Sequence, residues 1–138
     1  MRLTARIATV LSLAAATVAT AAAPAAAEKL TAYCGDTYGP DNGWHRCGIA
    51  TFDDPGNIEK ITVMDQNRDG HSVVAVWQNQ STGAYSNVWH VDGVGNSTVE
   101  YVDYLAEGTP VRFKVCAGEG GSLQILSSTC SQWIHLTA

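Results

Sequence analysis

Apolar and polar residues alternate along much of this chain, which is typical of β-strands with one buried face. In residues 61–63 two aliphatic side chains flank a threonine, and in residues 109–116 three apolar side chains face one way while Arg112 and Lys114 face the other. Residues 71–78 carry apolar side chains on both faces, as expected for a buried central strand. We find no helical period over three turns outside the N-terminal segment.

Turn-forming residues separate these segments at intervals of about eight to twelve positions. Asp53–Asn57 contains Pro and Gly in turn order, Asn79–Asn87 is a polar loop, and Ala117–Ser122 is a glycine-rich hairpin turn. Residues 28–33 are a first strand or a free arm. The pattern predicts an all-β fold, a small disulfide-stapled antiparallel β-sandwich or barrel.

The first 27 residues have the organisation of a secretory signal peptide. Arg2 and Arg6 precede an apolar stretch that begins at Ile7, and Ala25–Ala27 forms a small-residue cleavage site. A membrane anchor is the alternative, but the apolar stretch is short and rich in alanine. We therefore expect a signal peptide at 1–27 and a single secreted, extracellular β domain at 28–138.

Four cysteines lie in the domain, and an even number in an exported chain indicates two disulfides. Of three possible pairings we favour the local ones, Cys34–Cys47 and Cys116–Cys130. Each closes a loop of about 15 residues and contributes about 3 kcal/mol in the chain-entropy model. Zinc is the competing interpretation, but no Cys-x-x-Cys or His-x-x-x-His pair is present.

The domain is acidic, which bears on its partners. Removal of Arg2 and Arg6 leaves six basic and thirteen acidic residues, a formal charge of −7. No basic patch is visible in the sequence. Nucleic acids and anionic membrane surfaces are therefore not expected as partners.

Residues 65–70 resemble part of a calcium-binding loop. Asp65, Asn67 and Asp69 are spaced two apart and Gly70 follows, but the twelfth position is Val76, which cannot ligate calcium. Asp and Asn also form tight turns, and Asp-Gly is a strong hairpin signal. We favour a hairpin turn and keep a structural calcium or other cation site as the alternative; no other cofactor is expected.

The sequence offers no catalytic set. Its histidines lie in four different segments, and neighbouring strand residues such as His71 and Ser72 point to opposite faces. No serine occupies a Gly-x-Ser-x-Gly elbow. Since no nucleophile, base and orienting group can be named together, we expect a protein that is not an enzyme.

Tryptophan and tyrosine are more numerous than a small core requires. Trp44 and Tyr85 lie in predicted loops and are the candidate binding residues, because exposed aromatic rings can stack on sugars or anchor a protein interface. Packing within the protein is the alternative for each. Trp77 and Trp133 lie in predicted strands, and we expect them in the core.

Three stretches, DQNRDGHSVVAVW, EGTPVRFKVCAGE and CSQW, resemble a group of small secreted actinobacterial β-domain proteins. The shared features are an Asp-Gly-His-Ser turn, here Asp69–Ser72, and a cysteine-containing final hairpin. The resemblance covers about residues 61–138 and implies an exported, non-catalytic β domain. Small secreted β proteins of such organisms include inhibitors and the adaptor subunits of secreted toxin particles.

We therefore expect a secreted, non-catalytic module, an adaptor or accessory protein, that binds another secreted or cell-surface protein. A free arm at residues 28–33 could add a strand to a partner's sheet. The alternatives are a carbohydrate-binding or cell-surface-binding module that uses Trp44 and Tyr85, and a small protease inhibitor.

Overall fold

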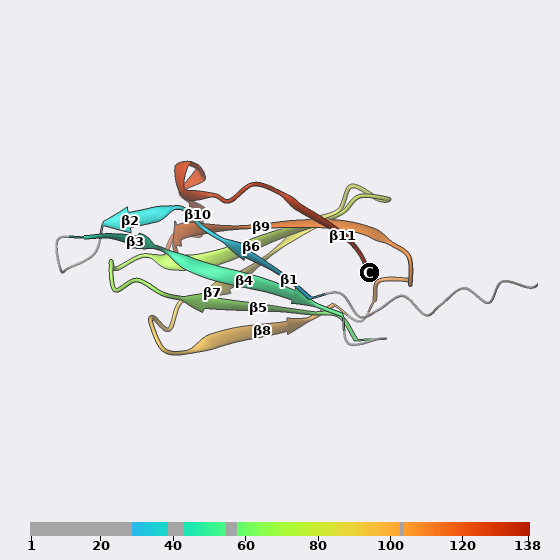
Figure 1. Ribbon diagram of the computed structural model, residues 1–138, viewed down its shortest axis with the longest axis horizontal. Coiled ribbons are helices and arrows are strands. Elements are labelled where there is room, and N and C mark those ends of the chain that lie inside the picture. The colour runs from blue at the N-terminus through green and yellow to red at the C-terminus, as the bar shows by residue number, and fades with distance from the viewer. Residues whose placement is uncertain (1–28, 39–42, 55–57, 103) are drawn as a thin grey trace, which may run out of the picture.

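Almost every regular element in the described part of this chain is a β-strand (Figure 1). The computed structural model describes residues 29–38, 43–54, 58–102 and 104–138, without the side chains of Tyr38 and Trp44. The predicted signal peptide lies outside the described residues and stays a prediction.

The first sheet has four antiparallel strands in the order β1-β4-β5-β8. These strands are β1 (Lys29–Tyr33), β4 (Gly48–Asp53), β5 (Lys60–Asp65) and β8 (Ser97–Tyr101). All five residues of β1 pair with β4, so this segment is an edge strand of the sheet and not a free arm.

The second sheet is built around the apolar strand β6 (Ser72–Asn79), which pairs with β7 (Tyr85–His90) on one side and with β9 (Pro110–Glu119) on the other. Two short strands, β10 (Gln124–Ile125) and β11 (Ile134–Thr137), share the far edge of β9. The predicted central strand is confirmed. The loop predicted at Asn79–Asn87 is wrong in its second half, because Tyr85 begins β7.

A small hairpin lies between the first two cysteines, where the sequence indicated only a loop. It consists of β2 (Asp36–Tyr38) and β3 (Trp44–Arg46), and the Cys34–Cys47 disulfide closes its base. The second disulfide joins Cys116 to Cys130, so the structure contains both bridges in the predicted pairing.

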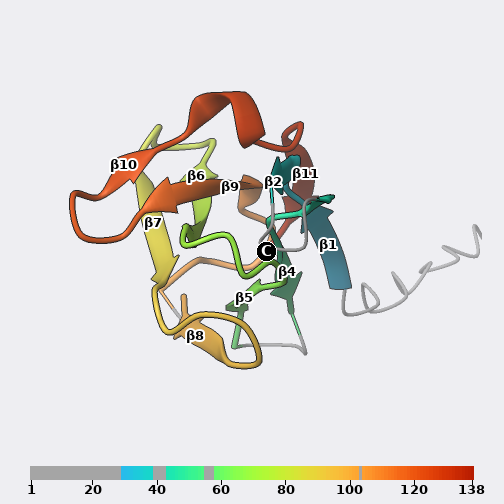
Figure 2. The ribbon, with the colours of Figure 1, turned by 90° about the vertical axis from the view of Figure 1, so that its left-hand side faces the viewer.

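The two large sheets face each other around one apolar core, with β7 and β8 meeting at one side and β1 and β11 at the other (Figure 2). Alternate side chains of the strands point into this core. Ile61 and Val63 do so from β5, and the apolar side chains of β9 do the same. Phe52 and Phe113 meet across the sheets at 6.0 Å between ring centroids. The predicted all-β, disulfide-stapled fold is confirmed.

A second apolar cluster covers part of the outer face of the second sheet. Because β6 is apolar on both faces, Val74 and Val76 point away from the main core and need a cover of their own. The cover is residues 120–133, which include the 3-10 helix η1 (Ser127–Thr129). Trp133 belongs to this outer cluster and lies outside any strand, so its expected place in the sandwich core is wrong.

Candidate functional site

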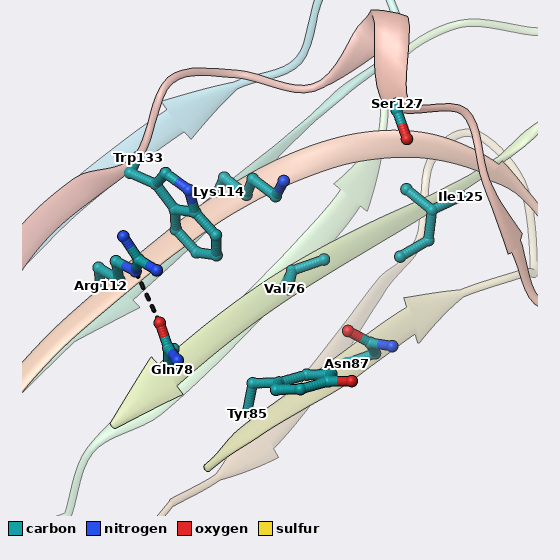
Figure 3. A pocket seen from close by; sticks show the side chains of 9 residues that line it. All are labelled: Val76, Gln78, Tyr85, Asn87, Arg112, Lys114, Ile125, Ser127 and Trp133. Atoms are coloured by element: carbon teal, nitrogen blue, oxygen red, sulfur yellow. Dashed lines mark hydrogen bonds between the residues drawn. The ribbon is translucent and has the colours of Figure 1, made fainter. Parts of the chain in front are cut away.

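A hollow of about 490 Å³ lies on the outer face of the second sheet, where the cover stops (Figure 3). We call it the sheet hollow. Its floor is two rows of three side chains that the strand register aligns across β9, β6 and β7. These rows are Arg112–Gln78–Tyr85 and Lys114–Val76–Asn87.

The wall of the hollow comes from the covering segment, which contributes Ile125, Ser127 and Trp133. Hydrogen bonds to β9 fix this segment: the Ser131 N–H donates to the Val115 carbonyl at 2.8 Å, and the Leu126 N–H donates to the Ala117 carbonyl at 2.9 Å. The Cys116–Cys130 disulfide adds a covalent tie between cover and strand. The wall is therefore held in place before any ligand arrives.

Two cations lie against the indole of Trp133. The Arg112 Cζ is 4.3 Å and the Lys114 Nζ is 4.7 Å from the ring centroid. The Arg112 Nε also donates a hydrogen bond to the Gln78 Oε1 at 2.8 Å. Within the described part of the chain, neither cation has an ion-pair partner, and no Asp or Glu lines the hollow.

Tyr85, one of the two predicted binding residues, lines this hollow. Its side chain is 72% exposed, and it lies across Val76 from Trp133 (Figure 3). Tyr85 also lines a second hollow of about 290 Å³, the edge hollow, together with Trp77 and Tyr104. Trp77 is buried in the main core as expected, and its indole Nε1 has no hydrogen-bond partner among the described residues.

Trp44, the other predicted binding residue, begins β3 in the small hairpin. Its side chain lies outside the described residues, so its binding role stays a prediction. Trp133, Arg112 and Lys114 were not predicted as site residues. The alternation of Arg112 and Lys114 on the polar face of their strand was visible, but nothing in the sequence aligned them with Tyr85.

The hairpin turn predicted at residues 65–70 is wrong. These residues lead from β5 in the first sheet to β6 in the second. Their side chains tie this crossover to the small hairpin. The Asn67 Nδ2 donates to the Thr37 carbonyl at 3.0 Å and to its Oγ1 at 2.9 Å, and the Thr37 hydroxyl donates to the Asp69 carboxylate. The Asp65 Oδ1 accepts the Asn67 N–H at 2.9 Å.

Asp65 is 4% exposed, and its burial raises the pKa of its carboxyl group above 3.8. The hydrogen bond from the Asn67 N–H lowers this pKa, as does the charge interaction with His90, whereas the Asp69 carboxylate raises it further. Among the described residues, no group of three or more His, Cys, Asp and Glu side chains is arranged to hold a metal ion. The cation site at Asp65, Asn67 and Asp69 stays a prediction.

The histidines occupy separate environments in the fold. His71 contacts Glu119 at 2.8 Å on the surface, and His135 bonds Gln80 at 3.2 Å. His90 is fully buried between the Thr98 hydroxyl at 3.0 Å and the Gly93 carbonyl at 2.9 Å. His45 lies on β3 of the small hairpin.

Comparison with protein families, with curated proteins and with solved structures finds no match to this chain. Within the described residues, no helix has the length and apolar character needed to cross a membrane. The two disulfides fit an extracellular protein.

Proposed function

We propose that this protein is a secreted, non-catalytic carbohydrate-binding module, and that the sheet hollow holds the sugar. The observation that carries the proposal is the pair of aromatic side chains, Trp133 and Tyr85, on the two sides of a floor with polar groups at its edges. This is the second of the functions expected from the sequence, with Trp133 added as a binding residue.

The chemistry of the lining suits a sugar ring, which has apolar C–H faces and a polar rim of hydroxyl groups. Aromatic side chains offer flat apolar surfaces, and amides and hydroxyls both donate and accept hydrogen bonds. The Asn87 amide and the Ser127 hydroxyl line the hollow without a hydrogen-bond partner among the described residues. Both are therefore available to a ligand without the loss of an internal bond.

The size of the hollow also favours a small ligand or a short length of polymer. A volume of about 490 Å³ falls within the range typical of small-molecule sites. A stable protein interface covers about 800 Å² on each partner and is usually a broader surface. The fixed wall lowers the entropy lost on binding, as in preorganised sites.

The test is binding of the exported protein to a panel of neutral, acidic and amino oligosaccharides. Tyr85→Ala should weaken binding about tenfold or more, because an exposed aromatic anchor is lost. Tyr101→Ala is the matched control: Tyr101 is 61% exposed on β8 of the first sheet and should leave affinity unchanged. The proposal is wrong if no saccharide binds, or if both variants behave alike.

Binding of another protein was the first function expected from the sequence, and the free edge of β8 in the first sheet supports it. Among the described strands, β8 pairs only with β5, so one edge of β8 has no strand partner. Val99 and Tyr101 are exposed on it. An exposed edge with apolar side chains is a surface to which a partner's strand can add. Val99→Lys should abolish such an interaction and leave saccharide binding intact.

A further inference from the structure

We propose that the saccharide held in the sheet hollow is acidic, an oligosaccharide whose anionic group lies against Arg112 and Lys114. The anionic group is a carboxylate of a uronic acid or a sulfate ester, which offer the same charge-assisted hydrogen bonds. This inference rests on the proposed function and adds the chemical class of the ligand.

The charge distribution is the first argument. The domain carries thirteen acidic and six basic residues, so its net charge is negative. Arg112 and Lys114 nevertheless lie two positions apart on one face of β9, about 7 Å along the strand, with no ion-pair partner among the described residues. The hollow is thus a local positive site in an acidic domain, which attracts an anion.

The geometry of Arg112 is the second argument. Its Nε donates to the Gln78 amide oxygen and its Cζ lies 4.3 Å from the Trp133 ring centroid, so the side chain is held on two sides. The terminal Nη groups have no hydrogen-bond partner among the described residues. A guanidinium that is already fixed loses little freedom when it forms the paired hydrogen bonds that carboxylates and sulfates accept.

The ligand is expected to stay on the outer face of the second sheet. Tyr85 lines both the sheet hollow and the edge hollow, but Val76 in the sheet hollow faces outward while Trp77 in the edge hollow faces the main core. Tyr104, 66% exposed, lines the edge hollow. Tyr104→Ala should therefore leave the binding of an acidic saccharide in the sheet hollow unchanged.

The experiment compares matched probes on the exported protein by calorimetry, with NMR to locate binding. The probes are tetragalacturonate, its full methyl ester, a sulfated galactose tetrasaccharide and the unsulfated form. Wild-type protein should bind an anionic probe about tenfold or more tightly than its neutral counterpart, since a charge-assisted bond is lost in the latter. Arg112→Gln combined with Lys114→Gln should remove that preference, whereas Lys60→Gln, which removes a cation from the first sheet, should not.

The outcomes separate this inference from the proposed function. A preference for tetragalacturonate assigns a carboxylate, and a preference for the sulfated probe assigns a sulfate; both support the inference. Equal binding of acidic and neutral probes, with Tyr85 still required, overturns the inference and leaves the proposed function standing. If no saccharide binds, both the inference and the proposed function are overturned. This holds even if an octapeptide of glutamate binds at Arg112 and Lys114.

Discussion

The outer faces of the two sheets are built from the same kind of strand but differ in how their polar groups are engaged. On the first sheet, the hydroxyls of Thr31 and Thr51 bond each other at 3.1 Å, and Lys60 lies 3.3 Å from Asp53. On the second sheet, Arg112 and Lys114 lie over an indole and have no acidic partner among the described residues. On the first face these polar groups therefore engage one another, whereas the two cations of the second face lie without an acidic partner.

The difference between the two outer faces follows from the sequence of strand β6. The outward positions of the first sheet mix threonines and charged residues with apolar side chains such as Ile49, Met64 and Val99, and none of these positions is fully buried. The outward Val74 and Val76 of β6 require a cover, and residues 120–133 provide it over only part of the sheet. The sheet hollow lies where this cover of the apolar strand ends.

The largest effect should follow from removal of the tie between cover and sheet. Cys116→Ala combined with Cys130→Ala should lower the free energy of unfolding by about 2–5 kcal/mol, the usual loss for a small secreted domain. Binding should fall as well, because Trp133 and Ile125 belong to the released wall. Urea denaturation and calorimetry on the same protein measure both quantities.

The matched control removes the other disulfide, Cys34–Cys47, which closes a loop of similar length beside the small hairpin. Stability should fall to a similar extent, while affinity per folded molecule stays the same. If both double variants lose affinity alike, the wall has no special role and the comparison between the two faces fails.

Next in size is a change beneath the cover. A Cβ added at Gly118 would lie 2.7 Å from the Trp89 ring and 2.8 Å from the Gln124 carbonyl oxygen. Because one of these neighbours is backbone, Gly118→Ala should lower the free energy of unfolding by about 1–3 kcal/mol. Gly121→Ala, with nothing within 4 Å of the added atom, should change it little. Equal thermal stability of the two variants would mean that the indole is not packed on Gly118.

Most of the fold could be predicted from the sequence because the alternation of apolar residues is local. Val111, Phe113 and Val115 pointed inward as expected, and cysteine spacing gave both disulfides. The site could be predicted only in part. Tyr85 was selected as an exposed aromatic, but its alignment with Gln78 and Arg112 depends on the pairing of three strands, which no local pattern encodes.

A smaller effect concerns Asp65, at the crossover that joins the two sheets. Burial raises the pKa of Asp65 in the folded state, so folding favours the protonated carboxyl group. The protonated carboxyl group therefore stabilises the fold below the unfolded-state pKa, and this contribution is lost as pH rises through the folded-state pKa. Asp65→Asn keeps an oxygen that can accept the Asn67 N–H and removes the charge. The stability of this variant relative to wild type should therefore increase with pH in thermal melts across the acidic range. A relative stability that falls with pH would mean that Asn67 and His90 outweigh burial.

The smallest effect is expected from calcium. The oxygens of Asp65 and Asp69 already accept hydrogen bonds within the crossover, from the Asn67 N–H and from the His71 N–H at 2.9 Å. Calcium would have to compete with these bonds for the carboxylate lone pairs, and Asp65 is buried, so millimolar calcium should leave the melting temperature nearly unchanged. A ligand at a hundred times its dissociation constant adds about 2.7 kcal/mol, which is a shift of several degrees in a domain of this size. Such a shift, abolished by Asp65→Ala and by Asp69→Ala, would establish a cation site at the crossover instead.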